Sequence, residues 1–338
     1  MIGKPEIIRI AGQLNLNPHV VEKDYALGWL LAGIFANNKI ADSWVFKGGT
    51  CLKKCFFETY RFSEDLDFTL KDESHLDEKF LGEVFEEIGE WVYEKCGIEM
   101  PADSQKFDIY DNPRGRKNCQ GKISYRGPVS PTTGGWPRIK LDLTADENIV
   151  LSPVYLPIFH PYSDAPDGDI TVQTYAYEEA FGEKVRALAE RTRPRDLYDV
   201  INLYRNIEAR PAPSVLLDVL SQKCEFKGIA VPKATDLDPF KDELKAGWEH
   251  MLRHQLPALP PVESFWIVLP EFFGWLESGI APEIPASYTS APGETVLRDR
   301  TVRLPVRPIL QSYLEVIRFA ASNRLCVDLE YQGRTRRI

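Results

Sequence analysis

The sequence of 338 residues lacks the features that mark membrane, secreted and disulfide-stabilised proteins. No run approaches the ~18 to 20 apolar residues that span a bilayer, and the opening MIGKPEIIRI has no apolar signal core. The six cysteines include no CxxC pair, and a chain of this length does not need disulfides to hold its core. We therefore expect a cytoplasmic globular protein, without membrane association, whose cysteines are reduced and mostly buried.

The chain also lacks the excess of basic charge expected of a protein that coats nucleic acid. Its formal net charge is −9, whereas unspecific duplex binding is driven by lysines and arginines that neutralise phosphates. The charge is uneven, because the segment from residue 298 to the end holds nine arginines, no lysine and four acidic residues. A local basic surface is compatible with this distribution.

What the chain does contain is an alternation of helix-like and strand-like segments, which is typical of an α/β or α+β domain. Apolar residues recur at helical spacing in some segments, and β-branched or aromatic residues alternate in others. The stretch 107–125 has strand-like ends, and its polar middle, DNPRGRKNCQGK, is interpreted as a hairpin loop. The other predicted elements of this part are helices over 7–16, 18–37 and 77–96 and strands over 42–46, 66–70 and 138–144.

Changes in composition divide the chain into three predicted parts. Residues 1–175 form the α/β domain, and residues 176–278 form a helical domain that opens with helices at 177–190 and 197–205. Residues 279–338 combine a proline-rich linker or extended arm with a partial helix–strand module. The sequence has no internal repeat and no low-complexity segment.

A glycine turn stands where a strand is predicted to meet a helix, in the sequence FKGGTC. Gly48 and Gly49 follow the strand, and Thr50 is expected to cap a helix over residues 51–60. Free backbone N–H groups and the helix dipole would face a phosphate there, while glycine lets the backbone approach closely. The turn is not a Walker P-loop, because Lys47 precedes the glycines instead of following them.

Two aspartates, Asp65 and Asp67, are separated by one residue and therefore point to the same face of a strand. Carboxylates this close would raise one pKa unless a cation lies between them. An exposed edge strand or turn would accommodate the pair, and so would a magnesium site that also binds a substrate phosphate. Asp142, in RIKLDLT, is the candidate third carboxylate of a two-metal site, or alternatively a surface residue. Arg61 and Ser63, just before the acids, could orient a phosphate or a carboxylate.

Three segments, in order, resemble the motifs of a known enzyme family. They are VVEKDYALGWLL at 20–31, FKGGTCLKKCFFETYRFSEDLDF at 46–68 and FGEKVRALAERTRPRDLYDV at 181–200. Together they resemble the AbiEii/AbiGii toxin nucleotidyltransferases, a branch of the polymerase-β-like nucleotidyltransferase superfamily. The resemblance implies an α/β (α+β) fold with a mixed sheet flanked by helices, followed by a helical region.

The resemblance also implies a reaction, the magnesium-dependent transfer of a nucleoside monophosphate from an NTP to an acceptor with release of pyrophosphate. It implies a toxin of a toxin–antitoxin or phage-defence system, with a cognate antitoxin as partner and RNA, foremost tRNA, as acceptor. The resemblance and the patterns of the residues themselves together give the candidate site. The catalytic acids would be Asp65, Asp67, Asp142 and Asp196, of which the first three hold the metal, and Asp142 comes from the strand pattern alone. The nucleotide-binding residues would be Lys47, Gly48, Gly49, Thr50, Arg61, Ser63, Lys184 and Arg195, of which Lys47, Arg61 and Ser63 come from their positions beside the glycines and the acids.

Each of these interpretations has an alternative. By itself, the charged triplet Glu22-Lys23-Asp24 predicts the solvated side of an amphipathic helix, and Lys184 predicts an ordinary solvated helix lysine. The protein could also bind an NTP and magnesium as a sensor without turnover, or transfer the nucleotide to a protein hydroxyl.

The last 23 residues, VIRFAASNRLCVDLEYQGRTRRI, resemble the entry into a WYL-type module, a small barrel that follows a helix. The segment is predicted to contain one strand and a turn around Gly333. A single strand cannot form a barrel, so this end would pair with another element or belong to a longer module.

Overall fold

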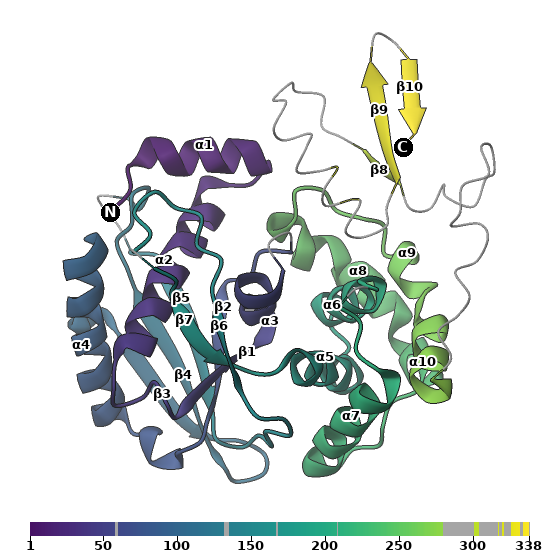
Figure 1. Cartoon of the computed structure of the whole chain (residues 1–338), viewed down its shortest axis with the longest axis horizontal. Helices are drawn as coiled ribbons and strands as arrows, with labels where there is room; N and C mark the ends of the chain where they lie inside the picture. Colours follow the sequence, from purple (N-terminus) through teal and green to yellow (C-terminus); the bar gives the residue numbers. More distant parts are fainter. Residues whose placement is uncertain are drawn as a thin grey trace. The chain divides into compact units, whose positions relative to one another are not determined.

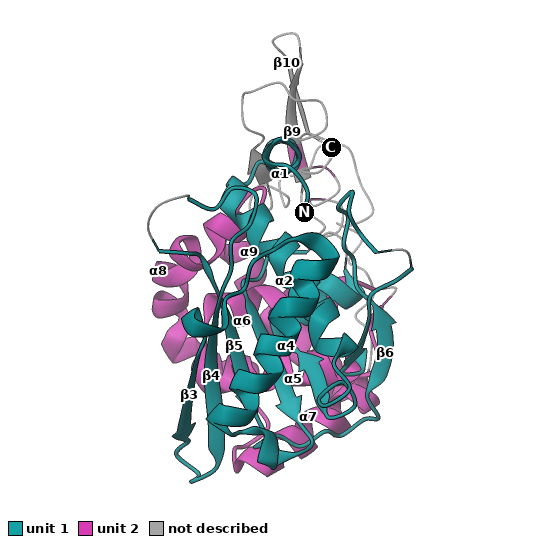
Figure 2. Cartoon of the chain, turned by 90° about the vertical axis from the view of Figure 1, so that its left-hand side faces the viewer, with its two compact units in different colours: residues 1–177 teal, residues 178–338 magenta. Residues whose placement is uncertain are grey.

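The computed structural model of the chain divides into two compact units, residues 1–177 and 178–338, which Figure 2 draws in teal and magenta. Figure 1 labels the elements along the chain. The structure describes residues 1–57, 60–131, 135–166, 168–207, 209–279, 301–303, 317, 320, 326–331 and 334–337.

Unit 1 is built, within its described residues, on a seven-stranded mixed sheet in the order β3-β4-β5-β2-β1-β7-β6. The pairs β2–β5 and β1–β7 are parallel, and the other neighbours are antiparallel. The strands are β1 (Trp44–Lys47), β2 (Asp65–Leu70), β3 (Lys106–Asp111), β4 (Lys117–Ser124), β5 (Arg138–Thr144), β6 (Val154–Pro157) and β7 (Thr171–Thr174).

The helices of unit 1 begin and end at recognisable signals. Asn17 and Asp77 accept hydrogen bonds from backbone N–H groups at the starts of two helices, and Gly97 ends the second of these in a left-handed conformation. The described helices are α1 (Lys4–Leu14), α2 (Pro18–Ala36), α3 (Gly48–Cys51), the π-helix η1 (Leu52–Phe56), η2 (Glu73–His75), α4 (Glu78–Cys96) and η3 (Ala102–Ser104).

One face of the sheet is apolar and forms the core of unit 1. Phe85 of α4 packs against Trp44 and Phe107, and Phe35 of α2 packs against Phe68, so both helices cover this face. The buried residues that the strands contribute to it include Trp44, Phe46, Leu66, Phe68, Phe107, Ile123, Ile139, Leu141 and Leu143.

The alternate residues of the same strands form the opposite face, which we call the polar face. Because side chains alternate along a strand, Lys47, Asp65, Asp67, Gln120 and Asp142 all belong to it. Burial alternates accordingly, and β5 follows the pattern most regularly. An apolar face covered by helices beside a polar face is the usual pattern of a half-solvated antiparallel sheet.

Several elements differ from the sequence prediction. The polar middle of 107–125 is mostly strand, because β4 begins at Lys117 and presents Gln120 and Lys122 on the polar face. The helix after the glycine turn begins at Gly48 rather than Cys51, and its π-helical end stops at Phe56. The predictions for 77–96 and 138–144 are confirmed almost to the residue.

The charged triplet of α2 is also not solvated as predicted. Glu22 and Asp24 are buried, because α2 packs on the sheet and meets partners from distant loops. Glu22 accepts hydrogen bonds from the backbone N–H groups of Val129 and Ser130 at 2.5 and 2.7 Å. Lys23 is partly buried and pairs with Glu64 at 3.1 Å.

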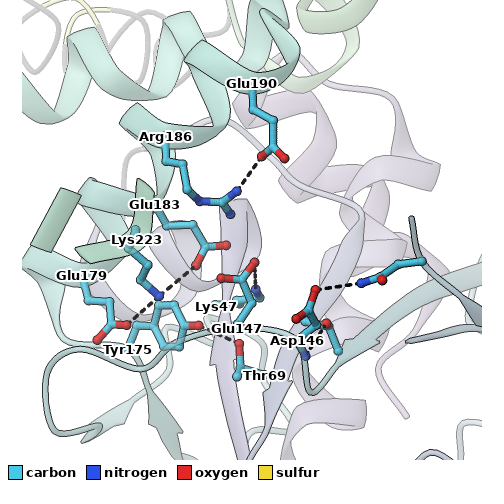
Figure 3. Close-up of polar contacts among 12 residues, drawn as sticks. Lys47, Thr69, Asp146, Glu147, Tyr175, Glu179, Glu183, Arg186, Glu190 and Lys223 are labelled. Atoms are coloured by element: carbon cyan, nitrogen blue, oxygen red, sulfur yellow. Dashed lines mark hydrogen bonds and ion pairs between the residues drawn. The ribbon is translucent and has the colours of Figure 1, made fainter. Parts of the chain in front are cut away.

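Unit 2 is a helical array followed by a small sheet. The buried Lys223 of α7 pairs with Glu179 of α5 at 2.7 Å and so ties these two helices together (Figure 3). The described helices, the first of which begins at the unit boundary, are α5 (Tyr177–Arg191), α6 (Pro194–Arg205), α7 (Pro213–Lys227), η4 (Ala234–Phe240), α8 (Lys241–Leu252), η5 (Arg253–Gln255), α9 (Glu263–Trp266) and α10 (Leu269–Ser278).

The C-terminal residues that the structure describes form three strands in the order β10-β9-β8. They are β8 (Thr301–Arg303), β9 (Cys326–Tyr331) and β10 (Arg334–Arg337). The prediction of one strand and a turn is therefore wrong, because β10 returns antiparallel to β9. Most of the predicted linker and most of the helix predicted after it lie outside the described residues. Among the helices that are described, none has the length and apolar character needed to span a bilayer.

Candidate active site

The three aspartates predicted as metal ligands lie on the polar face of the sheet, at its centre. Asp65 and Asp67 belong to β2, and the parallel register places Asp142 of β5 directly opposite Asp67. Neighbouring strands lie about 4.8 Å apart, so the carboxylates of an opposite pair start from adjacent backbone positions. Asp142 therefore shares a face with the other two acids, as the two-metal interpretation requires.

The glycine turn lies against this row of acids. Gly48 has φ +81°, which favours glycine, and a Cβ added there would stand 2.1 Å from Oδ2 of Asp67. A Cβ on Gly49 would stand 2.7 Å from Nη2 of Arg61 and 3.1 Å from Oγ of Ser63. The absence of side chains at both glycines thus brings the backbone of the turn next to a carboxylate, a guanidinium and a hydroxyl.

Thr50 anchors the turn to the strand of the acids. Its buried hydroxyl donates a hydrogen bond of 2.5 Å to the carbonyl oxygen of Asp65. The residue at the N-cap position of α3 is Lys47, so the prediction that Thr50 caps a helix is wrong. This hydroxyl ties the glycine turn to β2.

Lys47 ends β1 opposite Asp67 and is buried. Its Nζ lies 4.0 Å from Oε1 of Glu147 and 5.7 Å from the centre of the Tyr175 ring. Figure 3 marks the ion pair with Glu147. The Tyr175 hydroxyl is 2.6 Å from Oγ1 of Thr69. Glu147 was missed by sequence reasoning, and its only signal there was its position just after the strand that carries Asp142.

A buried ion pair supports the π-helix behind the glycine turn. Nζ of Lys54 lies 2.7 Å from Oδ2 of Asp24, which also accepts a hydrogen bond of 2.8 Å from the Tyr162 hydroxyl. Burial disfavours the charged carboxylate of Asp24, but Lys54, Lys53 and the two hydrogen bonds outweigh it and lower its pKa. Asp24, the second acid of VEKDY, thus acts by fixing the helix that follows the turn.

The motif of unit 2 forms a cluster of ion pairs around two buried carboxylates. Asp196 receives both Nε and Nη2 of Arg191 at 2.8 Å, and Nζ of Lys184 lies 3.8 Å away. Lys184 is closer to Asp199, at 2.8 Å, and both carboxylates are fully buried. Arg195 donates from Nε to the carbonyl oxygen of Met251 at 3.3 Å. Lys184 is therefore not the solvated helix lysine that it would be in isolation.

The donor set on the polar face can be tested against the expected magnesium ion. Aspartate oxygens are the ligands that this ion prefers, and the register places three of them together. In the part of the chain that the structure describes, however, no group of three or more His, Cys, Asp or Glu side chains is arranged to hold a metal. The carboxylate of Asp67 lies against Gly48. The donors fit magnesium in kind and in backbone position, although their side chains do not converge.

A mixed sheet with a glycine turn beside paired strand aspartates defines the class of nucleotidyltransferases, and comparisons with known proteins place the chain within it. The family model described as nucleotidyl transferase AbiEii toxin, type IV toxin–antitoxin system, matches residues 29–277. The chain therefore belongs to the AbiEii toxin family and is a nucleotidyltransferase.

Among solved structures, the chain is similar to MenT4, a nucleotidyltransferase toxin from Mycobacterium tuberculosis H37Rv. The two share 18% identity with a TM-score of 0.53, over 82% of this chain and 90% of that one. At this identity the likeness shows the fold, and it confirms the predicted fold class. No curated protein matches the chain. The family match ends at residue 277, so the WYL-like character of the C-terminal segment stays a prediction.

Proposed function

We propose that this toxin transfers a nucleoside monophosphate from an NTP to the 3′ end of an RNA, with tRNA as the acceptor and magnesium as the cofactor. A cognate antitoxin would be its partner, and phage defence is a setting in which such a toxin would act. Because donor and acceptor are cytoplasmic molecules, the reaction would take place there. The observation that carries the proposal is the register that places Asp142 opposite Asp67, beside the turn at Gly48.

The turn is proposed to bind the donor. Backbone N–H groups at Gly48 and Gly49 would bind triphosphate oxygens, because the missing side chains leave the backbone open to close approach. Arg61 and Ser63, which lie against Gly49, would orient the same phosphates. Lys47 would add a positive charge from the end of β1.

Asp65, Asp67 and Asp142 are proposed to hold magnesium. The ion, when bound, would neutralise the phosphates and lower the pKa of the attacking hydroxyl. That hydroxyl oxygen then forms a bond to the α-phosphorus, the bond from this phosphorus to the bridging oxygen breaks, and pyrophosphate leaves. Asp142, as the third carboxylate, would help to take the proton of the hydroxyl.

The later motif is proposed to serve the donor as well. Lys184 and Arg195 would contact the triphosphate, and Asp196 would be the late acid that the family requires. In the described ion pairs Lys184 already faces two carboxylates, so a phosphate would have to replace Asp199 as its nearest partner. This makes the role of Lys184 the most demanding part of the proposal.

The direct test incubates the protein with each labelled NTP, magnesium and total RNA. The expected result is a labelled RNA whose 3′ end, when sequenced, carries the added nucleotide and so identifies donor and acceptor together. A variant with Asp65→Asn and Asp67→Asn serves as the control and should give no product. Absence of labelled RNA with all four nucleotides would contradict the proposal, and label in protein would redirect it to adenylylation of a protein hydroxyl.

A second candidate, an NTP-binding sensor without turnover, is favoured by the ion pairs that already engage Lys184 and Asp196. Calorimetry and a pyrophosphate assay separate the two functions. Tight NTP binding with no pyrophosphate release at any RNA concentration would support the sensor.

A further inference from the structure

Three lysines stand in a row across the polar face, next to the row of acids. Lys106 of β3 is directly opposite Lys122 of β4, which is directly opposite Lys140 of β5. The row continues into β2, where Lys140 is opposite Asp65. We call these three residues the lysine row; it crosses the strands β3, β4 and β5 seen together in Figure 2 and ends at an acid of the proposed transfer site.

The lysine row is exposed and largely lacks anionic partners. Lys106 and Lys140 are exposed, and neither makes an ion pair with any residue that the structure describes. Lys122 makes one, with Asp108 at 3.3 Å, and its side chain is 37% exposed. Arg138, two residues before Lys140 on the same face, is exposed as well. Like charges directly opposite each other destabilise a sheet. A row of them in a chain of net charge −9 therefore points to an anionic ligand.

The polar face also carries an aromatic side chain, which is separated from the lysine row by the row of residues that contains Asp142. Tyr110 of β3 is 44% exposed and lies opposite Asn118 of β4 on the polar face. On this face Tyr110 is next to the row in which Asp108, Gln120 and Asp142 stand opposite one another, so the ring is close to the site. Cations that follow a phosphate backbone, together with an aromatic ring on which a base can stack, are the elements of single-stranded nucleic-acid recognition.

We propose that the lysine row, with Arg138 beside it, binds the phosphate backbone of the RNA acceptor and directs its 3′ end to Asp65 and Asp67. This inference rests on the proposed function, because it takes the acids as the point of transfer. An acidic segment of a protein partner would satisfy the same charges. The continuity of the row with Asp65 and the exposed ring of Tyr110 favour the RNA, because only an acceptor has to end at the acids.

The test measures RNA binding by the full chain without added NTP. Fluorescence anisotropy of a fluorescein-labelled, 20-nucleotide single-stranded RNA is recorded over a range of KCl concentrations. The variant is the triple change Lys106→Gln, Lys122→Gln and Lys140→Gln. Its affinity should fall by about tenfold or more at 0.1 M salt, and the slope of log affinity against log salt should decrease by about 2, because each phosphate contact to a single strand contributes about 0.7.

The matched control removes the same charge elsewhere in unit 1, with Lys4→Gln, Lys79→Gln and Lys95→Gln on α1 and α4. All three control lysines are exposed, and α4 covers the apolar face of the sheet. The control should bind RNA within about twofold of the wild type. Equal losses in both variants, or no loss in the lysine-row variant, would overturn the proposal.

Two further measurements separate this inference from the proposed function and from a protein partner. If the wild type shows no nucleotide transfer but RNA binding depends on the lysine row, the proposed function fails while the surface stands. If transfer occurs and the lysine-row variant keeps both RNA affinity and KM for RNA, the proposed RNA-binding surface is refuted while the proposed function stands. Poly-glutamate bound more tightly than RNA, with that binding lost in the variant, would assign the row to an acidic protein and overturn the proposal.

Discussion

The motif acids of unit 1 and those of unit 2 are held in opposite ways. Asp65, Asp67 and Asp142 share a partly accessible face of the sheet, where they stand next to one another. Asp196 and Asp199 are fully buried, and each is paired with a cation at 2.8 Å. The proposed function assigns the acids of unit 1 a cation from outside the chain, whereas the acids of unit 2 are ion-paired within their own unit. Equally recognisable motifs thus predict different consequences of mutation, one for catalysis and the other for stability.

The largest effect should come from the acids on the sheet. Asp65→Asn with Asp67→Asn should lower nucleotide transfer by about 10³-fold or more, because the metal they are proposed to hold supplies several kcal/mol of transition-state stabilisation. Thermal unfolding should hardly change, with Tm within about 2 °C of the wild type, since both side chains are partly exposed and asparagine keeps their shape. A large drop in Tm without loss of activity would reverse the assignment of these acids.

Asp196→Ala should instead act on stability. Asp196 is fully buried but Arg191 is 46% exposed, so removing the carboxylate should cost about 3 kcal/mol of unfolding free energy, the low end for a buried ion pair broken from one side. Urea denaturation followed by the fluorescence of the tryptophans measures this loss. Asp196→Asn keeps the shape and a hydrogen-bond acceptor and should lose less. If Asp196→Asn unfolds like the wild type yet has no activity, the acid has the catalytic role proposed for it.

His160 is a third kind of buried ionisable group, and it can be compared with the two groups of acids through the pH dependence of stability. His160 packs against Tyr25 and Trp29 without a hydrogen-bond partner among the described residues, and burial, with a contribution from Lys54, lowers its pKa to about 3 from 6.5. Between these values the unfolded chain binds the proton and the folded chain does not. The unfolding free energy should therefore fall by up to about 1.4 kcal/mol for each pH unit below 6.5.

The measurement is urea denaturation at pH 7 and pH 5.5, with His160→Phe as the comparison because it keeps an aromatic ring. This variant should lose distinctly less stability than the wild type over the same interval. An identical pH dependence of both proteins would show that other groups set the acid sensitivity.

The smallest effect is expected at Thr50. Thr50→Val removes the hydrogen bond to the carbonyl oxygen of Asp65 and should cost about 1 kcal/mol of unfolding free energy. Thr50→Ser keeps the hydroxyl and should restore most of it. The structural role would be refuted if Thr50→Val left stability unchanged and raised only the KM for NTP, which is the result expected of a phosphate-binding hydroxyl.

Local patterns predicted most of the central sheet and the acids on it. The alternation in β5 fixes which face Asp142 belongs to, and Asp77 and Gly97 mark the ends of α4. What local patterns could not supply were the partners of buried charges. Oε1 of Glu22 accepts hydrogen bonds from the backbone N–H groups of Val129 and Ser130, more than 100 residues later in the chain.

The hairpin β3–β4 was predicted wrongly for a different reason. Its polar residues suggested a long loop, because polarity in a strand whose polar face stays exposed resembles the polarity of a loop. The same exposure leaves the cations of the lysine row accessible to a ligand.

The parallel pairing of β2 with β5 has a consequence for the time at which the enzyme becomes active. Asp67 and Asp142 come together only after the intervening chain, with α4 and the β3–β4 hairpin, has been synthesised and folded. Such non-local pairings form late because the loop between them must be closed first. A nascent chain that ends before residue 138 would already contain the glycine turn and two of the acids, but not the third. With the proposed set of three catalytic acids, the growing polypeptide is expected to be harmless to the cell until the centre of its sheet has closed.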